Sequence, residues 1–393
     1  MPRAYIVLGA GRQGTAAAID LAVRGEPDRI TLADLDPARA GAAADRVNRL
    51  AGREAVRGIG LDVTDRGAVT EALEPADACL AAVSYRLNEA ITEAALAART
   101  NLCDLGGNMD VVRRQLAMDE QAREVEVAVI PDCGEAPGLA NNLAAYACSL
   151  LDRVEELRLY DGGIPRHPRP PWSYELTFNV DGLTNEYDAT TTFVRDGRPV
   201  EVACLHPSED EVVDLGPPFG RLEALAAATA STLPLTLGNG VRTFTSKVLR
   251  WPGHGAQFRA FRDLGLFDET PIEAGGSRVI PREVFHALLD PRLRPADGSP
   301  DVVLARIVAV GLRHDRPVEA VVNLRVDPDP EARLTAMQRA TGGHAAIVLR
   351  LMASGEIPPG AHPVEQAIDP ARMVAEVRDR GFAVEERVTE MRA

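Results

Sequence analysis

Lysine is almost absent from this 393-residue sequence. Lysine and arginine together number 43, and Lys247 is the single lysine, which leaves 42 arginines. A coding bias toward arginine is one interpretation. The other is that position 247 does not accept arginine, because a guanidinium stays charged at every working pH and differs from an ammonium in shape. We therefore treat Lys247 as a candidate acid or base, or as a ligand for a substrate carboxylate.

The sequence lacks an excess of positive charge, because 58 acidic residues outnumber 43 basic ones. The formal net charge is -15 at pH 7, whereas a nucleic-acid or anionic-membrane partner would require a basic face. No apolar run reaches the length of a membrane span, and the first strand pattern starts at residue 4, which leaves no room for a signal peptide. We expect a small-molecule partner, with no nucleic acid and no membrane.

The cysteines of this sequence form no pattern typical of disulfides or of a metal site. The five cysteines are scattered, odd in number and without C-x-x-C spacing, which argues against disulfides and a zinc site and favours a reducing cytoplasm. The histidines show no spacing that suggests a metal, so we expect none.

A glycine turn near the N-terminus organises the chain. Gly9, Gly11 and Gly14 follow the apolar stretch 4–8 and precede an alanine-rich stretch at 15–24. Strand, glycine turn and helix form the context of a dinucleotide-binding fingerprint, in which the helix N-terminus faces the phosphates. We expect these glycines, with Arg12 and Gln13 between them, to bind the cofactor.

The acid about twenty residues further on indicates which cofactor. Asp34 ends the second strand pattern, where a carboxylate accepts hydrogen bonds from ribose hydroxyls and repels a 2′-phosphate. NAD is therefore favoured over NADP, although Asp36 is a competing acid and Arg39 could serve NADP. Further cofactor contacts are expected at the ends of later strands, from Asp62, Val63, Ala82 and Ser84.

The first third of the chain alternates strand and helix patterns, which predicts an α/β fold with a Rossmann-type doubly wound parallel sheet. Strands are expected at 4–8, 29–33, 56–61, 78–83, 101–105 and 127–131. A Gly/Pro-rich break at 131–138 marks the end of this NAD-binding domain, which we place at 1–132.

The pattern then changes to one typical of an α+β domain on an antiparallel or mixed sheet, which we place at 133–335. Strands are expected at 154–160, 174–180, 242–249, 304–311 and 319–326, with a hairpin turn at Asp196-Gly197. Residues 336–393 are expected to form a helix, a second helix and a strand that pack back on the first domain. The second domain should offer a strand edge or apolar face for a homodimer or a higher homo-oligomer.

Several stretches resemble the saccharopine dehydrogenase family, and most of all its lysine 6-dehydrogenase branch. The resemblance runs in order over nearly the whole chain and departs from the family pattern at Glu135, Trp172 and Val364. The stretches are 84–88 (SYRLN), 103–107 (CDLGG), 130–138 (IPDCGEAPG), 162–165 (GGIP), Tyr174-Glu175, 247–254 (KVLRWPGH), 362–366 (HPVEQ) and Arg380-Gly381.

The resemblance implies hydride transfer between an amine-bearing carbon and a nicotinamide. In the lysine branch the hydride leaves the ε-carbon of L-lysine, and the imine hydrolyses to a semialdehyde that can cyclise. Other branches form or cleave a secondary amine, as in saccharopine, and this remains the alternative.

This chemistry needs a proton acceptor for the substrate ammonium and ligands for the ends of the substrate. The catalytic candidates are Asp104, Lys247 and His254, the last because a histidine in a turn can titrate near neutrality. The substrate-binding candidates are Arg250 for a carboxylate, Glu175 for a distal ammonium, and the tyrosines Tyr85 and Tyr174. Lys247 and Arg250 lie three residues apart on a predicted strand, so only one of them should face the substrate.

Two rival hypotheses remain. Cys133 follows a strand, and a thiol there could attack an aldehyde, as in semialdehyde dehydrogenases. The other rival is a non-catalytic NAD-sensing regulator with the same fold, which would bind the cofactor without turnover.

Overall fold

The computed structural model describes residues 3–24, 29–188, 190–238, 240–295 and 299–391. The chain divides into two compact units. Unit 1 comprises Met1–Tyr146, Asp329–Leu334 and Gln338–Phe382, and unit 2 comprises Ala147–Pro328, Thr335–Met337 and Ala383–Ala393.

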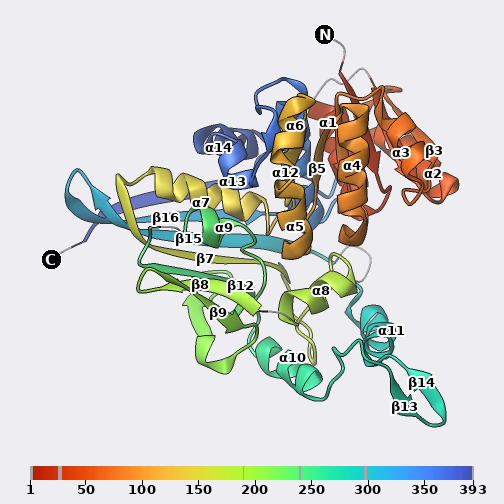
Figure 1. Cartoon of the computed structure of the whole chain (residues 1–393). Coiled ribbons are helices and arrows are strands. Elements are labelled where there is room, and N and C mark those ends of the chain that lie inside the picture. The colour runs from red at the N-terminus through yellow and green to blue at the C-terminus, as the bar shows by residue number, and fades with distance from the viewer. Residues whose placement is uncertain (1–2, 25–28, 189, 239, 296–298, 392–393) are drawn as a thin grey trace. The chain divides into compact units, whose positions relative to one another are not determined.

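Unit 1 is built on a seven-stranded parallel sheet (Figure 1). The strand order β17-β6-β5-β4-β1-β2-β3 contains the order 3-2-1-4-5-6 of a doubly wound dinucleotide-binding sheet, which confirms the predicted fold class. The strands are β1 (Ala4–Leu8), β2 (Arg29–Asp34), β3 (Val56–Gly60), β4 (Ala78–Ala81), β5 (Asn101–Asp104), β6 (Ala128–Ile130) and β17 (Gly360–Ala361).

Helices cover both faces of this sheet. Buried side chains of α3 and α4 pack on one face of β1 and β4, and Gly14 brings α1 against Val7 on the other face. The helices of this part of the chain are α1 (Arg12–Arg24), α2 (Pro37–Ala51), α3 (Arg66–Leu73), α4 (Asn88–Ala98), α5 (Met109–Leu116), α6 (Asp119–Glu124), α7 (Leu139–Ser149), α12 (Ala336–Ala353), α13 (Val364–Ala367) and α14 (Pro370–Asp379).

The late helix α12 packs against the early helix α1. A Cβ at Gly342 would lie 2.7 Å from the side chain of Ala16, so glycine permits the close approach of the two helices. The buried His344 then ties α12 to the segment after β6, with its ring nitrogens 3.0 Å from the carbonyl oxygen of Cys133 and 2.7 Å from the Oδ1 atom of Asn142. Burial lowers the pKa of His344 to about 4, so this ring is a neutral structural link.

Unit 2 is built on a mixed sheet, as expected. Its main path runs β10-β11-β12-β7-β15-β16-β18, and β12 is parallel to β7 while the other neighbours on this path are antiparallel. The strands are β7 (Arg153–Pro165), β8 (Thr190–Arg195), β9 (Arg198–Ala203), β10 (Glu211–Asp214), β11 (Arg221–Ala226), β12 (Thr243–Arg250), β15 (Asp301–Arg313), β16 (Arg316–Val326) and β18 (Ala383–Glu390), and β13 (Ile272–Ala274) with β14 (Ser277–Val279) form a separate hairpin (Figure 1). The helices are α8 (Val180–Tyr187), α9 (Leu233–Thr236), α10 (His254–Asp263) and α11 (Pro281–Leu293).

One predicted strand is wrong. Residues 174–179 form an irregular segment, and α8 begins at Val180. The side chain of Asn179 accepts a hydrogen bond from the backbone N–H of Gly182 and caps α8, a role for which asparagine is favoured. Tyr174 and Leu176 are both buried in the core of unit 2, so their alternation arose from packing of an irregular segment.

The two faces of β12 lie in different cores. Val248 packs with Tyr174, Tyr187 and Phe258, whereas Leu249 packs with Tyr160 and other residues on the opposite face. Because side chains alternate along a strand, Arg250 shares the face of Val248 and Lys247 shares the face of Leu249. The predicted separation of the two cations is therefore confirmed.

In the described part of the chain no helix combines the length and apolarity that crossing a membrane demands. The same residues contain no cluster of three or more histidine, cysteine or acidic side chains suited to a metal ion.

Candidate active site

The glycine turn of unit 1 has the geometry of a dinucleotide site. A side chain at Gly9, whose φ is +102°, would collide with the carbonyl oxygen of Ala82, and one at Gly14 would collide with the carbonyl oxygen of Gly9. A Cβ at Gly11 would meet nothing within 4 Å. The packing of the chain therefore explains Gly9 and Gly14, while the bare backbone at Gly11 is what a closely bound pyrophosphate needs.

The helix that follows supports the same use. α1 begins at Arg12, so Arg12 and Gln13 lie in its first turn, where backbone N–H groups have no partner within the helix. The positive end of the helix dipole adds to the attraction for phosphate. The residues between the glycines thus fit the pyrophosphate of a dinucleotide.

Asp34 lies at the end of β2, directly beside the turn. Its carboxylate accepts hydrogen bonds from the backbone N–H of Ala10 and of Asp36, both at 3.0 Å. Leu35 next to it is 73% exposed, which is unusual for leucine and suits an adenine ring. Arg39 lies 3.7 Å from Asp34, so a cation that could meet a 2′-phosphate is also present.

The other expected cofactor residues follow the neighbouring strands. Asp62 and Val63 lie after β3, and Ala82 and Ser84 lie after β4. The Oδ1 atom of Asp62 accepts hydrogen bonds from the backbone N–H and the hydroxyl of Thr64, which lower the pKa of this exposed carboxyl. These residues share the carboxyl edge of the parallel sheet with the glycine turn, where ligands of such sheets bind.

Asp104 is fully buried at the end of β5. Its carboxylate accepts hydrogen bonds from the Gly106 N–H (2.7 Å), the Gln115 side chain (2.7 Å) and the Asp132 N–H (3.3 Å). Burial raises its pKa, and these donors oppose the rise. With both oxygens engaged by its own domain, Asp104 holds the loop 104–107 in place.

Two other candidate residues of unit 1 are Tyr85 and Cys133. Tyr85 lies beside Gly107, where a Cβ would be 3.4 Å from the tyrosine ring. The Cys133 thiol is buried and lies 3.3 Å from the carbonyl oxygen of Ile130. Burial raises the pKa of Cys133 well above its ordinary value, which keeps the thiol protonated and argues against a nucleophile.

Unit 2 contains a polar cluster around Arg250. The guanidinium is almost completely buried and donates to the Tyr187 hydroxyl, the Leu249 carbonyl and the Glu186 carboxylate, at 2.9, 3.0 and 2.9 Å. A Cβ at Gly162 would lie 3.0 Å from the Arg250 Nη1 atom. Glycine on β7 therefore makes room for this arginine.

His254 and Tyr174 belong to the same cluster. The Nε2 atom of His254 lies 3.0 Å from the Tyr187 hydroxyl, and the Tyr174 ring lies 4.9 Å from the His254 ring and 5.2 Å from the Arg250 guanidinium carbon. The expectation that His254 titrates near neutrality is wrong. Burial, and then the charge of Arg250, hold its pKa well below the usual range, so the ring is neutral.

The cluster also contains two carboxylates that the sequence did not single out. Asp161 pairs with Val248 across β7 and β12, which places it on the face of Arg250. Burial raises the pKa of Asp161 and of Glu186 to about 7 each, against the lowering effect of Arg250. An arginine with two acids that ionise near neutrality can accept and return a proton.

Two atoms of the cluster still lack a partner. The Oδ1 atom of Asp161 and the Nδ1 atom of His254 find no hydrogen-bond partner within the part of the chain that the structure describes. Both side chains are at most 2% exposed. Buried polar atoms normally have partners, so these two are available to a ligand.

Lys247 and Glu175 lie outside this cluster. The Nζ atom of Lys247 donates to the Glu209 carbonyl oxygen at 2.6 Å and to the Glu211 carboxylate at 2.5 Å on the other face of β12. Glu175 instead accepts a hydrogen bond from the Ser299 hydroxyl at 2.6 Å. The structure thus brings together Tyr174, Arg250 and His254, and separates Lys247 from them.

Of the two acids that sequence reasoning missed, Asp161 could have been found from the sequence and Glu186 could not. Asp161 precedes Gly162-Gly163 and falls, by the alternation of the strand, on the apolar face that Leu157 and Leu159 occupy. A charged residue on that face is a signal that could have been used. Glu186 lies in a helix with other polar residues, and nothing in its neighbourhood distinguishes it.

Comparisons with known proteins agree with this architecture. Residues 5–130 match the family model for the saccharopine dehydrogenase NADP binding domain, and residues 134–382 match that for the saccharopine dehydrogenase C-terminal domain. The fold is similar to that of saccharopine dehydrogenase (L-Glu forming) from Saccharomyces cerevisiae, with a TM-score of 0.77 and 16% identity over 98% of this chain and 100% of that one.

A curated relative matches only a short stretch. The quinate/shikimate dehydrogenase (NAD(+)) of Corynebacterium efficiens is 46% identical over 72 residues, which are 18% of this chain and 23% of that protein. The two family models, in contrast, together span nearly all of the sequence. The chain therefore belongs to the saccharopine dehydrogenase family.

Proposed function

We propose that the protein is an NAD-dependent dehydrogenase that oxidises the CH–NH2 carbon of an amino acid, and that its substrate is L-lysine, attacked at the ε-carbon. The observation that carries this proposal is the cluster of Arg250 with the buried Asp161 and the half-buried Glu186, two acids whose pKa values of about 7 suit proton exchange with an amine.

The cofactor would be held by the glycine turn and Asp34. Gly11 leaves the approach to the backbone open, α1 offers its N-terminus to the pyrophosphate, and the Asp34 carboxylate meets the ribose hydroxyls. Asp62, Val63, Ala82 and Ser84 would line the adenine and nicotinamide ends. When bound, the nicotinamide takes up the hydride that the substrate carbon releases.

The residues of the Arg250 cluster would accept the proton of the substrate ammonium. A substrate ammonium has no free electron pair, so it must lose a proton before the nitrogen can assist departure of the hydride. With both acids ionised, Arg250, Asp161 and Glu186 carry a net charge of about -1, which favours an ammonium over a carboxylate. We assign proton acceptance to the two acids and their orientation to Arg250, with neutral His254 and Tyr187 as hydrogen-bonding groups.

The products follow from that step. The carbon–nitrogen bond becomes an imine as the hydride leaves, water adds to the imine carbon, and ammonia departs to leave the semialdehyde. The amine proton taken up by the acids is available for the departing nitrogen. Tyr174, beside Arg250 and His254, is proposed to contact the substrate, and Tyr85 and Glu175 remain substrate-binding predictions.

One assay tests the substrate. The protein is incubated with NAD and, in turn, lysine, ornithine, simple diamines and saccharopine, while NADH absorbance is followed. Lysine turnover with release of ammonia is expected. Turnover of saccharopine alone would favour an enzyme that forms or cleaves a secondary amine, and cofactor binding without any turnover would favour an NAD-sensing regulator.

The cofactor is tested by calorimetry. Asp34→Ala is expected to weaken NAD binding by about 1–3 kcal/mol, the range for a lost hydrogen bond to a charged group. Asp36→Ala is the matched control, because its carboxylate caps α2. Tighter binding of NADP than of NAD by the wild type would refute the choice of cofactor and direct attention to Arg39.

We further propose a homodimer or higher homo-oligomer in the cytoplasm. Unit 2 exposes apolar side chains at Ile272 in the β13–β14 hairpin and at Val284 and Leu288 on α11, and such side chains support an interface. Light scattering that finds a monomer at micromolar concentration would contradict this assembly.

A further inference from the structure

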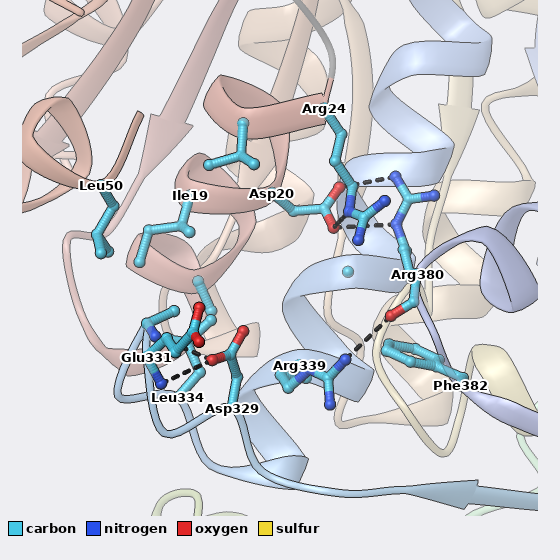
Figure 2. A pocket seen from close by; sticks show the side chains of 14 residues that line it. Ile19, Asp20, Arg24, Leu50, Asp329, Glu331, Leu334, Arg339, Arg380 and Phe382 are labelled. Atoms are coloured by element: carbon cyan, nitrogen blue, oxygen red, sulfur yellow. Dashed lines mark hydrogen bonds and ion pairs between the residues drawn. The ribbon is translucent and has the colours of Figure 1, made fainter. Parts of the chain in front are cut away.

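Unit 1 contains a cavity of about 280 Å³ on the second half of α1 (Figure 2). It is lined by α1, the loop 329–334, α12 and the residues that follow α14. At about 1.5 Å per residue, Asp20 is roughly 13 Å along the helix axis from the glycine turn. Ala16 is the lining residue nearest to the glycine turn in sequence, and none of the proposed cofactor residues lines the cavity.

One wall of the cavity is apolar. Ile19 and Val23 of α1, Leu50 of α2 and Leu334 line it (Figure 2). Val23 is 54% exposed and Leu50 is 38% exposed. Aliphatic surface is thus accessible to a ligand at this wall.

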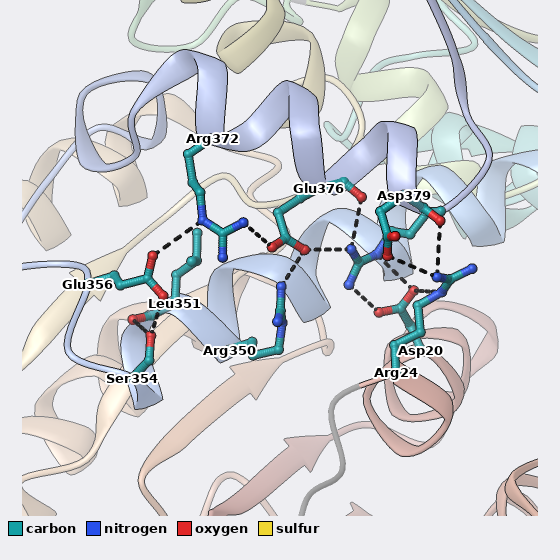
Figure 3. A network of polar contacts seen from close by, with 10 residues as sticks. Asp20, Arg24, Arg350, Leu351, Ser354, Glu356, Arg372, Glu376 and Asp379 are labelled. Carbon is teal, nitrogen blue, oxygen red and sulfur yellow. Dashed lines mark hydrogen bonds and ion pairs between the residues drawn. The ribbon is translucent and has the colours of Figure 1, made fainter.

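The opposite wall is charged and held rigidly. The Arg380 side chain is 3% exposed and bonds Asp20 at 2.7 and 3.0 Å and Glu376 at 2.8 Å. Glu376 also pairs with Arg350 and Arg372, and Arg24 pairs with Asp379 (Figure 3). This network holds the charged wall of the cavity in place before a ligand binds.

Charges of both signs line the cavity itself. Arg339 lies with its guanidinium carbon 5.3 Å from the centre of the Phe382 ring and donates to the Arg380 carbonyl oxygen at 3.0 Å (Figure 2). In the loop 329–334, Asp329 accepts hydrogen bonds from the backbone N–H groups of Glu331 and Ala332 and so shapes the loop. Three arginines and three carboxylates line the cavity in all: Arg24, Arg339, Arg380, Asp20, Asp329 and Glu331.

We propose that this cavity binds a free α-amino acid with an aliphatic side chain. Its carboxylate would meet Arg339, its ammonium would meet Asp329 and Glu331, and its side chain would cover Ile19 and Leu50. A polyphosphate or nucleotide is disfavoured, because the two acids of the loop would repel it.

The loop also gives this site a route to regulation. Residues 329–334 belong to unit 1, whereas the residues directly before and after them belong to unit 2. An amino acid that binds this loop would therefore contact a segment whose two ends continue into unit 2. The site goes beyond the proposed reaction and does not depend on it, because it is detected by binding alone.

The test is calorimetry on the full-length protein with leucine as the probe. Leucine is expected to bind, while 4-methylpentanoate, which lacks the ammonium, and isoamylamine, which lacks the carboxylate, bind at least about tenfold more weakly. Arg339→Gln and Leu50→Trp, which fills the apolar side, are each expected to weaken leucine binding about tenfold or more. Arg49→Gln and Leu264→Trp, at exposed positions outside the cavity, are the matched controls.

NAD titration verifies that each variant is folded, and Val23→Trp replaces Leu50→Trp if the latter does not pass. Absence of leucine binding to the wild type at millimolar concentrations would overturn the proposal. It would equally be overturned if leucine bound Arg339→Gln and the tryptophan variant as tightly as the wild type, because the amino acid would then occupy another site.

Discussion

Two buried cations on one strand, Lys247 and Arg250, show how differently the same degree of burial can be used. Each is 2% exposed and each contacts a carboxylate. Lys247 faces Glu211, whose side chain is 43% exposed and keeps contact with water. Arg250 faces the buried Asp161 and Glu186, whose side chain is only 17% exposed, and burial raises the pKa values of both acids to about 7. A buried pair of a cation and a carboxylate therefore indicates a proton-transfer site only where the carboxylate can change its charge near neutrality.

The largest expected difference between the two faces of β12 is the loss of activity when the acid beside each cation is neutralised. Asp161→Asn should reduce kcat/KM for the amine substrate by about 10²–10⁴-fold, the usual contribution of a positioned acid or base. Glu211→Gln, the matched change beside Lys247, should leave kcat/KM within a few fold of the wild type. Steady-state kinetics measures kcat/KM of both variants, with NAD affinity as the folding control. Equal losses of kcat/KM would contradict the assignment of proton transfer to the Arg250 face.

Stability should depend on pH through the Arg250 face. Because the folded-state pKa values of Asp161 and Glu186 are raised, the folded protein holds protons between about pH 4 and 7 that the unfolded chain has released. Stability is therefore highest below pH 4 with respect to these groups and falls by about 3–4 kcal/mol for each of them as the pH rises to 7. Denaturant titrations should show this fall in the wild type and a smaller one in Asp161→Asn. A fall of the same size in that variant would show that Asp161 does not contribute.

The coupling between the two acids sharpens the comparison further. The charge of Glu186 helps to raise the pKa of Asp161, after burial as the main cause. Glu186→Gln removes that charge, so the acid limb of the kcat/KM profile should move to lower pH, by about one unit. A limb that stays in place would mean that the substrate amine, and not this pair, sets the profile.

The smallest effect on turnover is expected at Lys247. Lys247→Arg keeps the charge but enlarges a buried side chain, so it should cost about 1–3 kcal/mol of stability through overpacking and leave kcat/KM nearly unchanged. The chemical denaturation midpoint and the rate together test this. A large loss of rate with NAD binding intact would return Lys247 to the list of proton-transfer candidates.

Local patterns made much of the fold predictable. The glycine turn, the six βα strands and the hairpin at Asp196-Gly197 depend on neighbours in sequence, and they were found where the pattern placed them. The alternation of a strand also predicted the opposite faces of Lys247 and Arg250. The same rule misassigned residues 174–179, because a buried irregular segment can alternate as a strand does.

The polar cluster was harder to foresee, because its members come from distant parts of the chain. Asp161 lies on β7, Glu186 on α8, and Arg250 with His254 at and after the end of β12. Sequence predicted Arg250, His254 and Tyr174, but the neutral state of His254 is a consequence of burial that only tertiary structure brings. The raised pKa values of the two acids have the same origin.

The sheet of unit 1 also has a consequence for biosynthesis. Its first six strands are complete at Ile130, but β17 pairs with β6 only when residues 360 and 361 have been made, and α12 covers α1 at nearly the same stage. At about 5–20 residues per second, a ribosome needs roughly 10–50 s to bridge that interval. Throughout it the growing chain carries an open strand edge at β6, a surface that invites pairing with other chains and that a chaperone would have to shield.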